Sequence, residues 1–319
     1  LKRGRLREGP ARVKDAEGRS AAGFLETAKF GSCLDQWTPA RSWALPDRSR
    51  KEVGSMRTFA AAALALGMAA LAGSAAAQTP NRTFEAVYAV HARGIDAGDF
   101  TYSFRQTGNS YTANAQREMK GWVGAALNRS QDYTYSVTGA VGADGVLRPT
   151  TYQHQGGRRR EDRPNGRLIR AQFTATDVIT TASPGQPNMG DPPATPAQRR
   201  GTIDQLTAIA AMVTTTGDPC ARTLNVYMDG RARFDFVMTP NGTVNVRSRA
   251  YEGQAVRCRV QFRPIAGFGE PPEASTLNFV FARTESGLWA PVTIEMPTDG
   301  VGVVRLEARR LTVNGARLR

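Results

Sequence analysis

Histidine is the usual general base of hydrolases and a common ligand of catalytic metals. The chain of 319 residues contains only two, His91 and His154. It has no Gly-x-Ser-x-Gly elbow and no His-Glu-x-x-His zinc pattern. Each histidine lies in a segment whose alternating pattern predicts a strand, so we expect both to be ordinary strand residues. We therefore predict no catalytic residue, no metal site and no cofactor.

Two pairs of carboxylates could support glycoside hydrolysis, which needs one acid and one base or nucleophile on either side of the scissile bond. The pairs are Asp96 with Asp99 and Glu161 with Asp162. Both lie at turn-like positions, where acids are common because they cap backbone N–H groups. We favour this structural role, and the catalytic one stays as the alternative.

An arginine-rich segment is the densest charge feature of the chain. We identify it as a possible anion-contacting patch formed by Arg158, Arg159, Arg160 and Arg163, with Arg167 and Arg170 beyond. Guanidinium groups suit phosphate and carboxylate partners. The simpler alternative is a solvated hairpin whose charge Glu161 and Asp162 offset.

Residues 56–77 have the three parts of a cleavable signal peptide. A short basic start at Met56 and Arg57 precedes an apolar run from Phe59 to Gly73, and small residues lead to Ala77. The run is mostly alanine, which is too weakly apolar for a membrane anchor. We predict cleavage near Ala77 and export to the periplasm. Because a signal peptide must be N-terminal, we expect residues 1–55 to be an untranslated, disordered upstream extension.

The net charge of +14 falls once these segments are set aside. Residues 78–319 hold 29 basic residues (42 less 13) and 21 acidic ones (28 less 7), a net charge of +8. Export also removes nucleic acid as a partner. Two cysteines remain, Cys220 and Cys258, and an even count in an exported protein predicts a disulfide.

Period-two alternation recurs along almost all of residues 78–319 and predicts about a dozen strands. Dipeptides that accept positive φ separate many of them and predict tight hairpins. They are Asp144-Gly145, Asp229-Gly230, Asn241-Gly242, Asp299-Gly300 and Asn314-Gly315. We predict one all-β, mainly antiparallel domain, a large curled sheet or open barrel.

One segment has helical spacing instead. Thr202 and Gln205 fit a capping box, and Leu206 and Val213 share an apolar face that Gly217 ends. We predict a short amphipathic helix packed on or inside the sheet. The Pro- and Gly-rich residues 182–200 before it predict a mobile connection.

Several landmarks in this order resemble the exported bacterial proteins of domain-of-unknown-function family 3108. They are Gly94-Ile95-Asp96-Ala97-Gly98, Asp144 to Pro149 with Tyr152, Asp204-Gln205-Leu206-Thr207, Met228-Asp229-Gly230-Arg231, Cys258 with Pro264 to Phe268, and Trp289-Ala290-Pro291-Val292. The resemblance covers residues 83–310. It implies an all-β periplasmic protein, similar in shape to lipoprotein carriers, in which a curved sheet wraps a helix. It implies no activity and no catalytic residue.

Two functions remain open. The first is a non-enzymatic cell-envelope factor that binds a lipid-like ligand or a partner protein. The alternative is a carboxylate-dependent periplasmic hydrolase acting on envelope material. The oligomeric state does not follow from the sequence.

Overall fold

The computed structural model describes residues 81–120, 133–156, 166–185, 190–269, 275–298 and 302–319. Strands dominate them, because β-branched and aromatic residues alternate with polar ones along each segment. The strands are β1 (Arg82–Ala92), β2 (Ile95–Thr107), β3 (Ser110–Met119), β4 (Tyr133–Val141), β5 (Leu147–Gly156), β6 (Arg167–Phe173), β7 (Val178–Ser183), β8 (Arg222–Met228), β9 (Ala232–Arg247), β10 (Glu252–Ala266), β11 (Thr276–Arg283), β12 (Trp289–Thr298), β13 (Gly302–Val313) and β14 (Ala316–Arg317).

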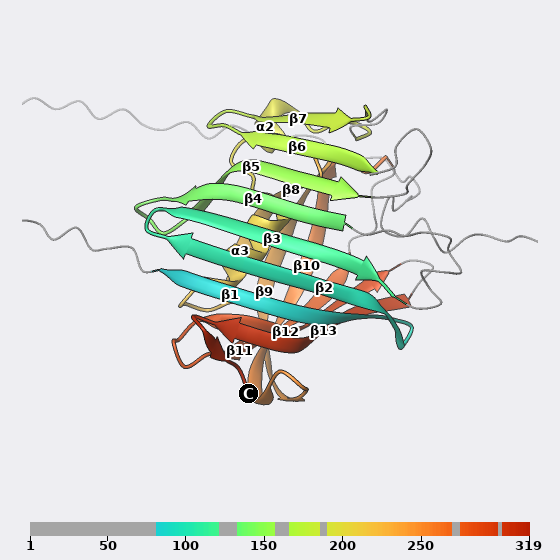
Figure 1. The fold of residues 1–319 in the computed structure, drawn as a ribbon. Helices are drawn as coiled ribbons and strands as arrows, with labels where there is room; N and C mark the ends of the chain where they lie inside the picture. The colour runs from blue at the N-terminus through green and yellow to red at the C-terminus, as the bar shows by residue number, and fades with distance from the viewer. Residues whose placement is uncertain (1–80, 121–132, 157–165, 186–189, 270–274, 299–301) are drawn as a thin grey trace, which may run out of the picture. The chain divides into compact units, whose positions relative to one another are not determined.

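All these strands belong to one antiparallel sheet. Its order is β7-β6-β5-β4-β3-β2-β1-β13-β12-β11-β10-β9-β8, with β14 paired to β13. Consecutive strands are therefore neighbours, except β7 and β8, which form the two edges, and the pairing of β1 with β13 joins the two halves. Figure 1 shows the sheet curling so that β8 to β10 lie behind β3 to β5. The predicted all-β, curled antiparallel architecture is confirmed.

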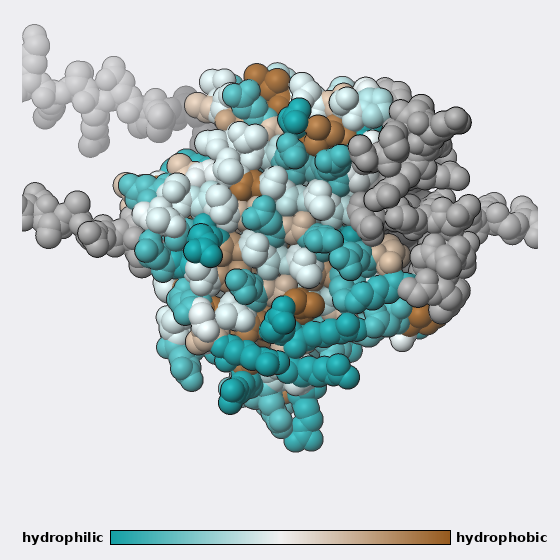
Figure 2. All heavy atoms as spheres, viewed as in Figure 1, coloured by the Kyte–Doolittle hydropathy of each residue, from teal (hydrophilic) through white to brown (hydrophobic). Residues whose placement is uncertain are grey.

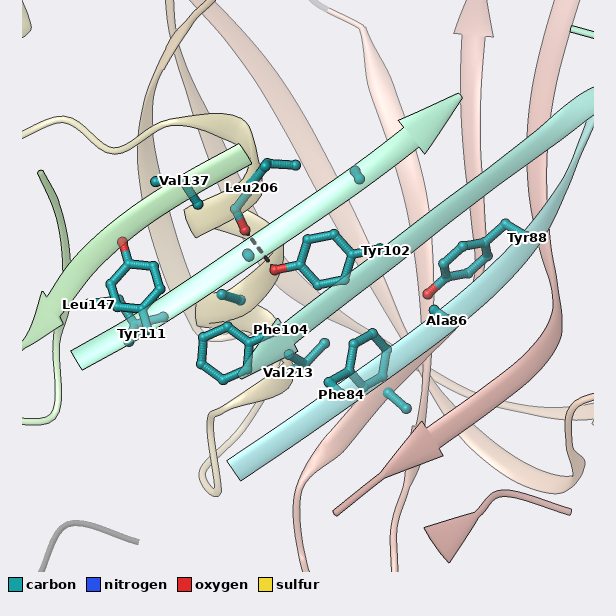
Figure 3. Close-up of a cluster of buried hydrophobic side chains, with 14 of the residues drawn as sticks. Phe84, Ala86, Tyr88, Tyr102, Phe104, Tyr111, Val137, Leu147, Leu206 and Val213 are labelled. Carbon is teal, nitrogen blue, oxygen red and sulfur yellow. Dashed lines mark hydrogen bonds between the residues drawn. The ribbon is translucent and has the colours of Figure 1, made fainter. Parts of the chain in front are cut away.

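Helix α3 (Gln205–Val213) lies inside the curl and contacts strands of both halves. Leu206, Ala210 and Val213 pack in a cluster that includes the inner residues of β1 to β5, while Ala208 and Met212 pack against β8 to β11. Figure 3 shows the first cluster, where the Tyr102 hydroxyl donates to the carbonyl oxygen of Leu206 over 2.9 Å. The helix is thus apolar on two faces, because it separates two cores.

The predicted start of this helix was wrong. Asp204, not Thr202, is the N-cap, and its carboxylate accepts from the backbone N–H groups of Leu206 and Thr207. Ile203 instead forms a parallel β-bridge with Val226. That bridge holds the backbone in an extended conformation as far as Asp204, so helical geometry begins only after this residue.

The connection before α3 is more ordered than its composition predicted. Within described residues 190–200, α2 (Pro196–Arg199) has a complete capping box between Thr195 and Gln198. Arg199 also forms a bidentate ion pair with Asp177, with N–O distances of 2.7 and 2.8 Å. The expected mobile connection is therefore wrong for this part, because local capping and a tertiary ion pair fix it.

One predicted hairpin is a β-bulge instead. Asn241-Gly242 lies within β9, where the two residues oppose Arg257 alone and the register shifts. Gly242 has φ +77°, which a bulge accommodates as readily as a turn. The hairpin between β9 and β10 turns at Ser248 to Tyr251, with no such dipeptide. Asp299-Gly300 lies outside the described residues.

The predicted disulfide is present. Cys220, after α3, is joined to Cys258 in β10, with Cα atoms 5.2 Å apart. It ties the loop that follows the helix to the sheet. Among the helices of the described ranges, none has the length and apolarity needed to cross a bilayer.

Candidate functional site

A polar cluster joins β5, α3 and the turn between β8 and β9. The carboxylate oxygen Oδ1 of Asp229 accepts from the Tyr152 hydroxyl at 2.6 Å and from Nε2 of Gln205 at 2.7 Å. Nδ1 of His154 lies 3.1 Å from the same oxygen. Asp229 and Gly230 both have positive φ, so the tight turn predicted here exists and directs the carboxylate at the other two elements.

Charge and hydrogen bonding decide the ionisation of this cluster. Burial raises the pKa of Asp229, but the charge and hydrogen bond of His154 outweigh it, helped by Tyr152 and Gln205, so the pKa is lowered. The Tyr152 hydroxyl has its pKa raised by burial and by the Asp229 charge. Asp229 is thus an ionised acceptor and Tyr152 a neutral donor, an arrangement that fastens β5 to the turn after the edge strand β8.

A second buried carboxylate, Asp204, starts α3. It is 0% exposed, and its Oδ2 accepts from the Thr207 hydroxyl at 2.5 Å. That hydroxyl also hydrogen-bonds the Tyr111 hydroxyl at 2.8 Å. Burial raises the pKa of Asp204 from 3.8 to about 6, although its hydrogen bonds act in the opposite direction.

Arg117, on the inner face of β3, borders the polar cluster. Its guanidinium carbon lies 4.1 Å from the ring centroid of Tyr133, whose ring stacks on Tyr135 at 6.2 Å. The His154 ring contacts both tyrosines. Two buried nitrogens of Arg117, Nε and Nη2, have no hydrogen-bond partner within the described chain. A buried donor without a partner carries a free-energy cost, so this guanidinium is available to an acceptor.

The inner face of the other half of the sheet is rich in aromatic rings. The Phe cluster consists of Phe234, Phe236, Phe262, Phe268 and Phe279, with neighbouring centroids 4.9 to 6.4 Å apart. Three of its members, Phe236, Phe262 and Phe268, are only half-buried. The same holds for further inner residues, namely Phe100, Ile294, Met296 and Leu306. This apolar face is therefore not fully covered by α3.

The outer face of β1 to β5 has a different character. Figure 2 shows it as mostly hydrophilic or neutral. A shallow groove of about 520 Å³ crosses it, lined mainly by hydroxyl and amide side chains such as Ser103, Asn114, Thr134 and Gln153. These are the ordinary solvent-facing residues of alternating strands and form no convergent set of charges.

The predicted acid pair at the start of β2 is neutralised by cations. Arg309 donates to both carboxylates, reaching Asp99 at 3.0 Å and also pairing with Asp96. Lys120 pairs with Asp99 as well. The structure thus holds the two acids in an ion-pair network. His91 is a half-buried strand residue of β1 opposite Asp96.

The predicted arginine patch cannot be placed in this structure. Arg158, Arg159, Arg160 and Arg163 lie outside the described residues, together with the second acid pair, Glu161 and Asp162. Of the two arginines beyond, Arg170 donates to the Gln153 side chain at 3.2 Å and Arg167 to the Pro184 carbonyl at 3.2 Å.

Sequence reasoning treated the residues that do converge as unrelated. Asp229 was predicted as a turn residue and Gln205 as a capping residue. The available signal was that Tyr152, Gln205 and Asp229 fall in three separate landmarks of the family resemblance.

A comparison with known protein families confirms this resemblance. The family described as "Protein of unknown function (DUF3108)" matches residues 87–309. A solved structure, titled "Crystal Structure of Beta-barrel-like Protein of Domain of Unknown Function DUF1849 from Brucella abortus", is similar at 12% identity and a TM-score of 0.41, covering 74% of this chain and 98% of that one. Among curated proteins, none matches the chain. Since the family model spans well over half of the sequence, the chain belongs to the DUF3108 family.

Proposed function

We propose that the protein is an exported, non-enzymatic binding protein of the cell envelope that holds a lipid-like ligand on the inner face of its sheet. The observation that carries the proposal is the half-buried apolar face formed by the Phe cluster with Ile294, Met296 and Leu306. Apolar surface left partly open inside a fold is typical of a ligand site.

The chemistry of the polar groups also favours binding. Oδ1 of Asp229 accepts from Tyr152 and Gln205 and lies 3.1 Å from Nδ1 of His154, and Asp96 and Asp99 are paired with cations. A carboxylate that serves as a base or nucleophile must instead be free to meet a substrate. The acids of the described site are therefore better suited to holding the fold together than to hydrolysis.

Export rests on the signal-peptide pattern of residues 56–77. The disulfide is compatible with an oxidising compartment, where such bonds persist. The envelope is also where an apolar ligand would be met, which links the compartment to the inner face.

The test is binding of N-phenyl-1-naphthylamine, a neutral apolar fluorophore, to the protein purified from the periplasm. Phe236→Gln places an amide on the inner face, and we expect it to weaken binding at least tenfold. Val237→Gln is the matched control, because Val237 is the next residue of β9, is also half-buried and faces outward. Urea unfolding of each variant verifies that it folds.

Native mass spectrometry of the same material provides a second readout, since a bound lipid adds a discrete mass. Absence of both saturable fluorophore binding and added mass would refute the proposal. Equal weakening by the two variants would place binding elsewhere than on the inner face.

A further inference from the structure

The inner face of the sheet offers one strong donor group beside its apolar residues. Arg117 in β3 pairs in register with Phe100 in β2, and Phe100 pairs with Tyr88 in β1. The rings of Tyr88 and Phe100 are 6.3 Å apart. The guanidinium therefore lies at one end of an apolar row.

From Val90, two residues beyond Tyr88 in β1, strand pairing continues the row to the Phe cluster. Val90 in β1 pairs with Leu306 in β13, Leu306 with Ile294 in β12, and Ile294 with Phe279 in β11. Five strand spacings separate β3 from β11, which is about 24 Å measured along the curved sheet. A continuous apolar path thus begins at a cation.

The state of Arg117 indicates the chemistry at that end. Its Nε and Nη2 are buried and meet no acceptor among the described residues, while its plane lies over Tyr133. These two nitrogens form the side-on fork of a guanidinium, which matches the two oxygens of a planar carboxylate. The Asp229 carboxylate of the polar cluster already accepts from Tyr152 and Gln205 through Oδ1, which also lies 3.1 Å from Nδ1 of His154.

We infer that the ligand is a single-chain amphiphile with a carboxylate head, bound with the head on Arg117 and the alkyl chain along the inner face toward the Phe cluster. This inference rests on the proposed function and adds the class of ligand and its orientation. The aromatic stack of Tyr133, Tyr135 and His154 holds the guanidinium side of the site, and the half-buried residues of β10 to β13 receive the chain.

The test compares ligands of equal chain length and different heads. Palmitate, hexadecanol and hexadecyltrimethylammonium are each titrated into delipidated full-length mature protein against N-phenyl-1-naphthylamine. We expect palmitate to bind roughly tenfold to a hundredfold more tightly than hexadecanol, as hydrogen bonds to a charged partner allow, and the cation to bind most weakly. Octanoate should bind far more weakly than palmitate, by about fourfold per methylene group lost from the apolar path.

Substitutions of Arg117 then test whether this residue binds the carboxylate head group. Arg117→Gln should remove the preference for palmitate over hexadecanol, and urea unfolding of the variant verifies that it folds. Arg105→Gln is the matched control, because Arg105 is exposed on the outer face of β2. Arg117→Lys should retain only part of the preference, since it keeps the charge and loses the fork.

The outcomes separate this inference from the proposed function. Equal binding of palmitate and hexadecanol by the unsubstituted protein would overturn the head-group inference and leave an apolar binding protein. Hexadecyl phosphate bound more tightly than palmitate would overturn the choice of a carboxylate. If none of the ligands displaces the fluorophore and the fluorophore itself does not bind, both are refuted.

Discussion

Asp204 makes the stability of this protein depend on pH in a direction opposite to that of most carboxylates. Burial raises its pKa from 3.8 to about 6. A carboxyl with a higher pKa in the folded than in the unfolded chain binds its proton more tightly when folded, so its protonation stabilises the fold. The contribution is fully present below pH 3.8 and is lost as the pH rises through about 6. The difference between the two values corresponds to about 3 kcal/mol, of which about 1.3 kcal/mol is lost between pH 5 and 7.

Asp204→Asn isolates this effect. The amide oxygen of Asn can still accept from the N–H groups of Leu206 and Thr207, so the helix keeps its cap, but the side chain cannot ionise. We expect the free energy of unfolding of the variant, relative to the unsubstituted protein, to rise by about 1.3 kcal/mol between pH 5 and 7. Contributions of all other titrating groups cancel in this comparison.

The assay is urea unfolding with the disulfide intact, followed by circular dichroism at half-unit steps from pH 4.5 to 7.5. Asp218→Asn serves as the control for removal of an exposed carboxylate, one that accepts from the N–H of Cys220. A pH-independent difference for Asp204→Asn would refute the argument that burial controls this carboxyl.

Two further predictions concern stability. Gly230→Ala should destabilise the fold by at least 2 kcal/mol more than Gly145→Ala, as measured by urea unfolding: both glycines have positive φ, but a Cβ at Gly230 would overlap the Thr180 side chain, whereas one at Gly145 meets nothing within 4 Å. Cys258→Ser together with Cys220→Ser should lower the free energy of unfolding by about 4 kcal/mol, the chain-entropy value for a sequence separation of 38 residues, and a loss below 1 kcal/mol would show that the bridge does not restrain the unfolded chain.

Local patterns in the sequence were sufficient for the fold class. Period-two alternation determines which residues form strands, and positive-φ dipeptides such as Asp229-Gly230 and Asn314-Gly315 turn the chain between neighbours. Both effects act within a few residues, so they can be read without tertiary structure. The disulfide could also be predicted from the sequence, because only Cys220 and Cys258 follow the predicted signal peptide.

Local patterns were insufficient wherever a distant partner decides the conformation. Asn241-Gly242 has the same local preference as the hairpin dipeptides, yet the pairing of β9 with β10 on both sides makes it a bulge. Likewise, the bridge from Ile203 to Val226 delays the start of α3 until Asp204. In both places, pairing with another strand overrides the local conformational preference of the residues.

The sequence by itself determined an antiparallel β protein with one internal helix and one disulfide. Only the tertiary structure brought Tyr152, Gln205 and Asp229 together, and only it left Arg117 beside an apolar face with no acceptor among the described residues. The physical reason is that these contacts depend on how far the sheet curls. The curl brings β5 against the turn after β8, although these two strands are far apart in the strand order of the sheet, and no short-range pattern encodes that approach.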